Sequence, residues 1–528
     1  MKTTFPRQML KRCARNYPDK PAYLCGDRSS TWRDIDERSD RFAVALQRLG
    51  LVKGDVVSIL SLESIEVYEH FFACMKLGLV RVGVNVLYAW PEVRHVLLDS
   101  ATKLLLVDAR IRPMVDAHRA EIESFGIRIV GYNGEHGCDL DYETLIDLAA
   151  GEPTWPELVD DDLLLYSYTS GTTGVPKGVM LTQLGVSNVI QSCLVSFGFQ
   201  PDDIWCMPAA SAWVVVVMKV FGLGNGMTSV VPDGSFRITA FMRDVERFGI
   251  TAVLLVPTMI QRALADHAAN RYDLSKLRLL AYGSAPATPK LIRDARQQFG
   301  VEMLQTYGQT ETTGGWLTVL TEKDHQQALT GRPELLRSVG RVGPHYECSI
   351  RDDDGCPVPA GVRGEIWLRG ASVMKGYLNL PAASAEVLRD GWLRTNDIGR
   401  LDASGYLYLL DRRKFMIITG AVNVFPTAVE SVLSEHPAVL EVAVIGLPHP
   451  EWGEAVVAVA VIRPTHGDVT AEALIGFCDG KLSRPETPKH VVFVDELLKT
   501  VNGKLRKTDI RNWLLQADEL VPWSMTVE

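Results

Sequence analysis

Residues 166–178, from Tyr166 to Gly178, read Y-S-Y-T-S-G-T-T-G-V-P-K-G and follow an apolar run at residues 163–165 that is typical of a strand. The stretch combines three glycines, five serine and threonine hydroxyls and one lysine, Lys177. Glycines allow a tight turn that brings backbone N–H groups close to a ligand, and the hydroxyls and the ammonium add donors. The stretch therefore predicts a phosphate-binding loop, although its Ser-Gly and Thr-Gly pairs alone would also suit an ordinary polar turn.

The chain around this loop alternates short apolar stretches with stretches of helical periodicity. Residues 56–60 and 104–108 are predicted strands, and residues 65–77 and 289–299 are predicted helices. This alternation indicates mostly parallel sheets with helices outside them, in which ligands lie at the carboxyl ends of the strands. The predicted fold class is therefore α/β.

Two later regions suggest how the chain is divided. Residues 337–410 are rich in glycine, valine and short alternations, which predicts a small antiparallel, barrel-like part. The pattern resets after Asp411, and the strands and helices beyond it would form a compact α+β unit. We therefore predict a large N-terminal domain over residues 1–411 and a small C-terminal domain over residues 412–528.

The composition narrows the class of protein. The 528 residues are 47% hydrophobic and 23% charged, which is typical of soluble globular proteins. A net charge of −9 offers no basic field to nucleic acid. The nine cysteines show no C-x-x-C spacing, which favours reduced thiols and a cytoplasmic location over disulfides or a zinc site. No secretory signal and no transmembrane segment are expected, and the sequence leaves a homodimer open.

Further motifs follow the loop in order: Gly283-Ser284-Ala285-Pro286, Tyr307-Gly308-Gln309-Thr310-Glu311, Asp397, Arg412 and Asn502-Gly503-Lys504. With the loop, they resemble the adenylate-forming superfamily, which contains acyl-CoA synthetases, amino-acid adenylation domains and luciferases. The resemblance covers nearly the whole chain. The stretches from Asp411 to Lys414 and from Asn423 to Pro426 are most similar to acyl-CoA and aryl-CoA ligases.

The resemblance implies a site for ATP and Mg²⁺ in the large domain. The loop would hold the β- and γ-phosphates, Thr310 would contact the α-phosphate, and Glu311 would ligate Mg²⁺ through its hard carboxylate oxygen. Tyr307 would lie against adenine, and Asp397 would accept hydrogen bonds from the ribose hydroxyls with Arg412 assisting. The implied nucleotide contacts are Thr169, Ser170, Gly171, Thr172, Thr173, Gly174, Lys177, Gly283, Ser284, Ala285, Pro286, Gln305, Tyr307, Gly308, Asp397 and Arg412.

The resemblance also implies a small domain that moves between two half-reactions. Lys504 would stabilise the transition state of adenylation near the substrate carboxylate, together with Thr310 and Glu311. Lys414 lies at the position of the inter-domain hinge. A rotation there would bring Gly420 and Ala421 to the pantetheine thiol of coenzyme A.

Each of these residues also has an ordinary structural interpretation. Tyr307 could be a core aromatic residue, and Glu311 and Asp397 could be solvated loop acids. Lys504 lies in a basic run, which is usually a solvated surface. The order of the motifs, rather than any single residue, favours the functional interpretation.

The chain departs from the family pattern at several positions. Gln183 replaces a histidine after the loop, Asn396 replaces the glycine before Asp397, Phe415 replaces an acid after the hinge, and Leu498 replaces a proline before Lys504. None of these changes removes a predicted phosphate or ribose contact.

The largest departure concerns the acyl site. Ala210 and Ser211 stand where the family has an aromatic residue and a histidine. Their small volume leads to the hypothesis of a bulky or ring-containing hydrophobic acid, unless Trp213 or Trp316 fills the space. The predicted substrate pocket consists of Ala210, Ser211, Trp213, Val214, Gly314 and Trp316.

The predicted function is that of an acyl-CoA synthetase, which converts ATP, a carboxylic acid and CoA into acyl-CoA, AMP and pyrophosphate. An enzyme that loads a carrier-protein thiol and a nucleotide-binding protein without catalysis are the alternatives. Activation of an amino acid is disfavoured because the sequence shows no acid near Ser211 that could pair with an ammonium group.

Overall fold

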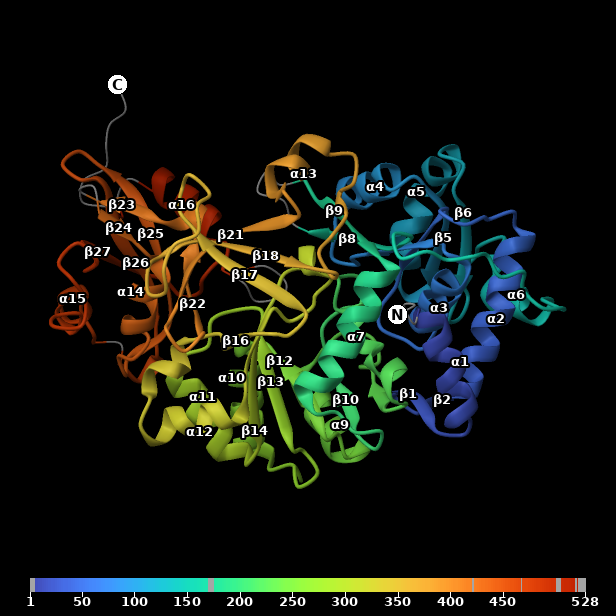
Figure 1. The fold of residues 1–528 in the computed structure, drawn as a ribbon, viewed down its shortest axis with the longest axis horizontal. Helices are drawn as coiled ribbons and strands as arrows, with labels where there is room; N and C mark the ends of the chain where they lie inside the picture. Colours follow the sequence, from blue (N-terminus) through green and yellow to red (C-terminus); the bar gives the residue numbers. More distant parts are fainter. Residues whose placement is uncertain are drawn as a thin grey trace.

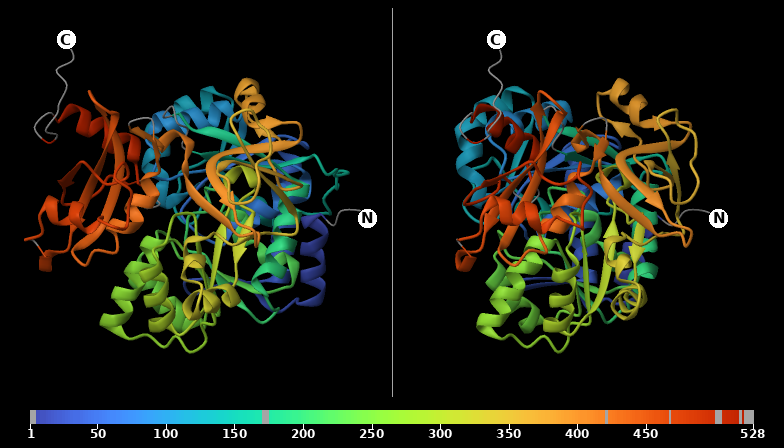
Figure 2. Two further views of the ribbon diagram at one scale, coloured as in Figure 1. Left: turned by 60° about the vertical axis from the view of Figure 1, so that its left-hand side comes forward. Right: turned by 90° about the vertical axis from the view of Figure 1, so that its left-hand side faces the viewer.

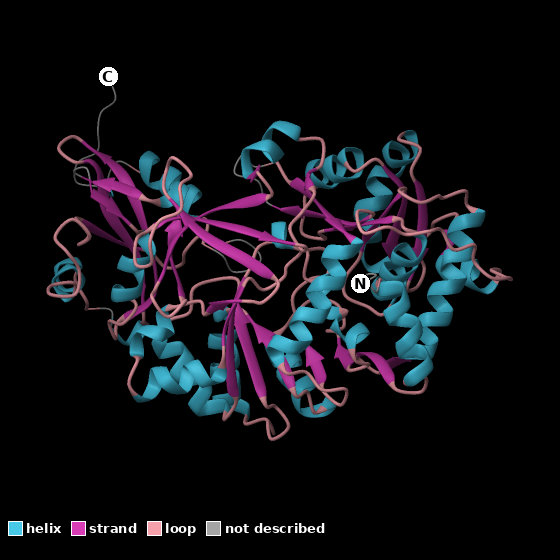
Figure 3. Cartoon of the chain, viewed as in Figure 1, coloured by secondary structure: helices cyan, strands magenta, loops and turns pink. Residues whose placement is uncertain are grey.

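The computed structural model describes residues 5–169, 175–419, 422–466, 468–499, 505–517 and 520, without the side chains of Lys414 and Thr465. Two large sheets, a smaller antiparallel sheet and a C-terminal sheet organise these residues (Figure 1). Figure 3 shows the helices gathered on the outer faces of the sheets and in the region between the two large sheets.

The first large sheet carries the strands on both sides of the predicted phosphate loop. Its order is β19-β9-β8-β4-β3-β5-β6-β7, and the strands from β8 to β7 pair in parallel. The strands are β3 (Val56–Leu60), β4 (Val80–Val84), β5 (Thr102–Asp108), β6 (Arg128–Tyr132), β7 (Leu140–Asp141), β8 (Leu163–Thr169), β9 (Lys177–Thr182) and β19 (Gly376–Tyr377).

The second large sheet has the order β16-β15-β14-β13-β12-β10-β11-β1-β2. Its central strands are parallel, and the pairs at both ends are antiparallel. The strands are β1 (Pro21–Cys25), β2 (Arg28–Thr31), β10 (Ile204–Cys206), β11 (Thr228–Val230), β12 (Ala252–Leu255), β13 (Leu279–Gly283), β14 (Glu302–Tyr307), β15 (Thr318–Leu320) and β16 (Arg341–Val342).

Helices cover both sheets and join them through one large apolar core. Residues of α3 and α7 belong to the same buried cluster as residues of both sheets, including Ile59 and Leu254. The N-terminus of α2 is capped by Thr31, because its hydroxyl accepts from the amide of Asp34. The helices are α1 (Pro6–Asn16), α2 (Trp32–Arg48), α3 (Glu66–Leu77), α4 (Trp90–Asp99), α5 (Arg112–Ser124), α6 (Tyr142–Asp147), α7 (Gln183–Phe197), α8 (Val216–Lys219), α9 (Ile238–Phe248), α10 (Pro257–Asn270), α11 (Pro289–Phe299), α12 (Glu322–Thr330) and α13 (Pro381–Val387).

The predicted barrel-like part is an antiparallel sheet that follows the second large sheet. It consists of β17 (Tyr346–Arg351), β18 (Gly364–Gly370), β20 (Leu388–Arg389), β21 (Trp392–Leu401) and β22 (Leu407–Arg412). The predicted α/β class, with mostly parallel sheets and this added part, is confirmed.

The C-terminal residues form a compact unit beside the large one (Figure 2). Its sheet contains β23 (Ile417–Thr419), β24 (Val422–Val424), β25 (Val439–His449), β26 (Gly453–Ile462) and β27 (His490–Phe493), with α14 (Pro426–Leu433), α15 (Ala471–Phe477) and α16 (Lys507–Gln516). The domain boundary after Asp411 stays a prediction. In the part of the chain described, no helix is both long enough and apolar enough to cross a membrane.

Candidate active site

The predicted phosphate loop connects two paired strands. Thr169 ends β8 and lies opposite Lys177, the first residue of β9, in an antiparallel pair. Loop residues 170–174 lie outside the described residues, so Ser170, Gly171, Thr172, Thr173 and Gly174 stay predictions. The strand pairing places Thr169 and Lys177 at the two ends of the loop, where both could face one ligand.

Lys177 and Glu311 approach the same tyrosine. The Lys177 ammonium lies 5.7 Å from the centroid of the Tyr377 ring. The Tyr377 hydroxyl donates to Oε1 of Glu311 at 3.0 Å, and burial raises the pKa of Tyr377 above its ordinary value. Tyr377 therefore connects the predicted phosphate lysine to the predicted metal ligand. No role is predicted for this tyrosine from the sequence.

The predicted ribose carboxylate is buried in a polar cluster. Asp397 is 7% exposed and accepts from the Tyr307 hydroxyl at 2.5 Å and from Nε2 of Gln309 at 2.6 Å. Nε of Arg412 lies 3.3 Å from the other oxygen of Asp397. The structure thus brings together three residues predicted from separate motifs. It adds Gln309, which lies within the Tyr307–Glu311 motif but is not among the predicted nucleotide contacts.

The charge on Asp397 is only partly offset by its partners. Burial raises the pKa of the Asp397 carboxyl above its ordinary value, although Arg412 and the hydrogen bonds from Tyr307 and Gln309 act in the opposite direction. The Arg412 side chain is 54% exposed, so water weakens its attraction for the carboxylate. The hydroxyl of Tyr307 is held by Asp397 while its ring packs in the apolar core. Tyr307 is therefore a core aromatic residue that also belongs to the cluster.

Two glycines of the predicted adenine site are required by close backbone contacts. A Cβ on Gly283 would lie 2.4 Å from the carbonyl oxygen of Thr306 on the neighbouring strand. A Cβ on Gly308 would lie 2.3 Å from the carbonyl oxygen of Gly315. These distances exclude any larger residue, so packing alone demands glycine at both positions. Ser284, Ala285 and Pro286 follow Gly283 at the carboxyl end of β13, and Gln305 lies near the end of β14.

The replacement of glycine by Asn396 before Asp397 is compatible with the local backbone. The φ of Asn396 is +59°, in the left-handed region, where asparagine is tolerated better than most residues other than glycine. The backbone therefore keeps the conformation that suits glycine at this position, and Asp397 keeps its partners.

An acidic residue, Glu63, contacts Ser211. The expectation from the sequence that no acid lies near Ser211 is therefore wrong. The amide and the hydroxyl of Ser211 both donate to the carboxylate of Glu63, and the hydroxyl contact is 3.0 Å. Glu63 lies 148 positions earlier in the sequence, so no local pattern announces the contact. The carboxylate is already paired with Lys219 at 2.8 Å, which leaves no free acid for the ammonium group of an amino acid.

The other predicted acyl-site residues occupy three surroundings. Trp213 meets Tyr88 edge to face, with ring centroids 6.2 Å apart. Val214 lies beside Gly314, where a Cβ would approach it to 3.2 Å. Trp316 packs against aromatic core residues, with its ring centroid 4.1 Å from that of Phe197. Ala210 is partly exposed.

Gln183 is buried at the start of α7. Its Nε2 donates to the carbonyl of Met75 at 3.3 Å, whereas Oε1 finds no partner among the described residues. The amide thus packs toward α3, and the structure connects it to none of the predicted ligand contacts.

Several predicted residues lie outside the described parts of the chain. Lys504, Gly420 and Ala421 belong to this group, and only the backbone of Lys414 is described, within a 3-10 turn. Among the described residues no group of three or more metal-ligating side chains is found, so the metal prediction rests on Glu311. A carboxylate oxygen suits Mg²⁺, and the remaining ligands would come from water and phosphates.

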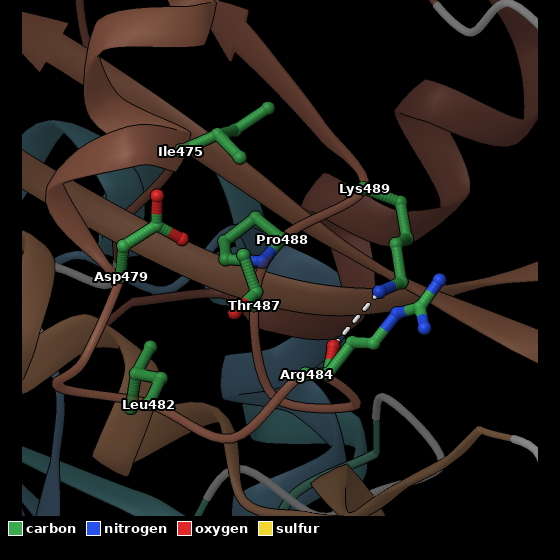
Figure 4. A pocket seen from close by; sticks show the side chains of 7 residues that line it. All are labelled: Ile475, Asp479, Leu482, Arg484, Thr487, Pro488 and Lys489. Carbon is green, nitrogen blue, oxygen red and sulfur yellow. Dashed lines mark hydrogen bonds between the residues drawn. The ribbon is translucent and has the colours of Figure 1, made fainter.

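A pocket of about 410 Å³ lies in the C-terminal unit (Figure 4). Arg484, Lys489 and Asp479 line it with four other residues, and the Lys489 ammonium donates to the carbonyl of Arg484. None of the predicted site residues lines this pocket, so its size does not identify it as the active site.

Comparison with known proteins agrees with this geometry. The family model described as AMP-binding enzyme matches residues 10–378, and the model described as AMP-binding enzyme C-terminal domain matches residues 428–504. An indoleacetate–CoA ligase of Aromatoleum aromaticum is 33% identical over 96% of this chain and 97% of its own length. A feruloyl-CoA synthase of Amycolatopsis sp is 34% identical over 95% of this chain and 97% of its own length. The solved structure of the amide bond synthetase McbA from Marinactinospora thermotolerans is 29% identical, covers 96% of this chain and 99% of its own, and has a TM-score of 0.84.

Proposed function

The chain belongs to the AMP-binding enzyme family, and on this premise we propose that it activates a hydrophobic, bulky or ring-containing carboxylic acid as its CoA thioester. Its reaction is that of an AMP-forming acyl-CoA synthetase, which uses ATP, Mg²⁺ and CoA. The acid, the residue roles and the domain movement are the proposed parts. The cytoplasmic location and the oligomeric state stay predictions.

The reaction has two steps, adenylation of the acid and transfer of the acyl group to CoA. A carboxylate oxygen of the acid attacks the α-phosphorus of ATP, the bond to the β-phosphate breaks, and pyrophosphate leaves. The sulfur of CoA then attacks the acyl carbonyl, the bond to the AMP oxygen breaks, and the thiol proton is released. Because negative charge accumulates in the first step, fixed cations and donors around the phosphates lower its barrier.

The contacts around Asp397 carry the proposal for the nucleotide side. A buried carboxylate with only partial compensation is a good acceptor for two ribose hydroxyls, and Tyr307, Gln309 and Arg412 hold it in place. Thr169, Lys177 and Thr310 would contact phosphate, and Glu311 would hold Mg²⁺, which neutralises phosphate charge when bound. Lys504 would stabilise the transition state of adenylation, and Lys414 would be the hinge for the movement of the small domain.

The class of acid follows from the acyl-site segment. Ala210 occupies little volume and is partly exposed, while Trp213 and Tyr88 present two aromatic rings at right angles. Val214 and Gly314 add an apolar surface. Aromatic rings pack well against such a surface, so a ring-containing acid gains more contact than acetate would. The CoA ligases for indoleacetate and ferulate among the relatives act on acids of this kind.

A panel of acids tests this proposal. The purified protein is assayed for AMP release with ATP, Mg²⁺ and acetate, octanoate, cinnamate or a polycyclic acid, with and without CoA. The ring-containing acids should give the highest kcat/KM, and product should require CoA. Ala210→Phe should lower kcat/KM for the bulkiest acids selectively, because the new ring fills the proposed space. A preference for acetate, or an unchanged ranking in Ala210→Phe, would remove the proposed class of acid. Transfer to an amine or a carrier protein instead of CoA would contradict the ligase.

A further inference from the structure

Glu63 stands at the centre of a buried polar cluster that the proposed mechanism does not use. It follows β3 on the chain and is 7% exposed. Its carboxylate accepts from the Lys219 ammonium at 2.8 Å and from the Tyr68 hydroxyl at 2.9 Å, in addition to both donors of Ser211. Four donors from three separate segments therefore converge on one side chain.

Every polar atom of Ser211 is bound within this cluster. The amide and the hydroxyl contact Glu63, and the carbonyl accepts from Nη2 of Arg81 at 2.9 Å. Ser211 is 2% exposed, and Arg81, on β4, is buried as well. Hydrogen bonds to charged groups are stronger than those between neutral groups, so this backbone position is held unusually firmly.

The sheet beneath the segment is shaped to receive it. Gly83, two residues after Arg81 on β4, lies so close to Ala212 that a Cβ would approach the Cα of Ala212 to 2.6 Å. Glycine at this position lets the backbone of the segment rest directly on the strand. The cluster and the strand thus fix Ser211 and Ala212 from two directions.

The residues that follow are those proposed to contact the acid. Trp213 comes immediately after Ala212 and meets Tyr88, and Val214 lies against Gly314. A shift of the backbone at Ser211 would move both side chains. The position of Trp213 against Tyr88 therefore depends on the contacts of Ser211 with Glu63 and Arg81.

We propose that Glu63 is a positioning residue for the acid: with Lys219, Tyr68 and Arg81 it fixes residues 211–214 so that Trp213 and Val214 form the surface that the acyl group contacts. The inference rests on the proposed function, since it takes these residues as the acyl site. It assigns Glu63 no contact with the acid and no part in nucleotide binding.

The burial of these charges explains why the cluster is firm. Burial alone would raise the pKa of Glu63, but Lys219 and the hydrogen bonds from Ser211 and Tyr68 hold it below its ordinary value. Removing one partner of a buried ion pair leaves the other charge without compensation, so a single substitution loosens the cluster. Replacing both partners removes that penalty while Gln at position 63 can still accept from the amide of Ser211.

Steady-state kinetics of four variants tests the proposal, with octanoate and cinnamate as the acids. Glu63→Gln should raise KM for the acid at least about tenfold, and Ser211→Ala about threefold to fivefold, as expected for one hydrogen bond. KM for ATP should change less than about twofold in both. Glu63→Gln/Lys219→Met should recover part of the loss. Gly83→Ala should raise KM for the acid in the same way, because it displaces Ala212 without touching the cluster.

Glu69→Gln is the matched control. Glu69 is also a buried carboxylate near the start of α3, but its partners Arg38 and Tyr142 belong to α2 and α6 and are not the partners of Glu63. It should leave KM for the acid unchanged. Equal effects of Glu63→Gln and Glu69→Gln on KM for the acid would overturn the proposal, as would a destabilised Glu63→Gln with a normal KM.

Hydrogen exchange separates this inference from the proposed function. In the free parent protein, the peptide covering residues 208–214 should exchange slowly, and in Glu63→Gln it should exchange at least about tenfold faster, whereas Glu69→Gln should leave it slow. A parent that forms no acyl-CoA from any acid would contradict the proposed function. Unchanged exchange in Glu63→Gln would contradict the positioning role, whatever the activity.

Discussion

Two buried carboxylates mark the two sides of the large domain, and they differ in how well the protein compensates their charge. Asp397, on the proposed nucleotide side, has a pKa above its ordinary value because burial outweighs its partners. Glu63, behind the proposed acyl side, has a pKa below its ordinary value because Lys219 and the donors of Ser211 and Tyr68 outweigh burial. A poorly compensated carboxylate is suited to receive a ligand, whereas a fully compensated one is suited to hold the chain.

This difference shows why burial and charge alone do not identify a binding residue. Both carboxylates are buried to the same degree, and both contact a cation and a tyrosine. The cation beside Asp397 is half exposed, whereas the one beside Glu63 is 2% exposed. Water screens the Glu63–Lys219 pair less than the Asp397–Arg412 pair, and we assign the Glu63–Lys219 pair the structural role.

The largest effect is expected from a substitution of Lys504, which is proposed to act on the acid and on ATP. Its charge would act on the carboxylate and the α-phosphate together, so Lys504→Ala should slow adenylation by about 10²- to 10³-fold. Formation of acyl-CoA from a synthetic acyl-adenylate should continue, and it is measured in a separate assay. If both half-reactions fell equally, Lys504 would not be specific to adenylation.

Asp397→Asn should affect ATP and leave the choice of acid unchanged. Loss of the charged acceptor should lower kcat/KM for ATP by about tenfold to a hundredfold, as for one or two hydrogen bonds to a charged group. The ranking of acids should stay as in the parent protein. A variant in which the ranking changed would show that the two sides are not separate.

The same variant should be more stable than the parent at neutral pH. A carboxyl with a raised pKa binds protons more readily when folded, so its contribution is favourable below its ordinary pKa and is lost as pH rises through the folded value. Replacing it with Asn removes that loss. Glu63→Gln should behave oppositely, because the stabilisation from a lowered pKa is present above the ordinary value and lost in acid. Unfolding temperatures at pH 7 and pH 4 decide whether the two carboxylates differ in this way.

A smaller effect is expected at Tyr377. Tyr377→Phe keeps the ring beside Lys177 and removes the hydroxyl that donates to Glu311. One hydrogen bond is worth about 1 kcal/mol, so kcat should fall about threefold to fivefold. Titration with Mg²⁺ should show a weaker apparent affinity, whereas an unchanged Mg²⁺ response would separate Tyr377 from the metal site.

The residues of the proposed nucleotide side could be selected from the sequence because they lie in recognisable motifs, and their roles stay predictions. Tyr307, Asp397 and Arg412 were each found in a separate motif, and the structure brings them together. Helix α11 begins and ends at the predicted residues, and α2 is capped by Thr31 within its own first turn. Local periodicity and capping are encoded within a few residues, so they can be read along the chain.

The acyl side could not be predicted in the same way. Glu63 and Lys219 lie in stretches with no special pattern, and 156 positions separate them. Only the tertiary packing of the chain brings them to Ser211, so no local pattern could indicate the acid there. No local pattern marks Arg81 either, since its partner is a backbone carbonyl 130 positions away.

The fate of the carboxylate oxygen tests the central claim most directly. The protein is incubated with ATP, Mg²⁺, CoA and cinnamate carrying ¹⁸O in its carboxylate, and the AMP is analysed by mass spectrometry. Attack of the carboxylate on the α-phosphorus followed by thioester formation transfers one labelled oxygen to AMP, so AMP should gain one ¹⁸O for each acyl-CoA formed. Label recovered in inorganic phosphate with ADP as the product, or AMP without label, would contradict an acyl-adenylate intermediate.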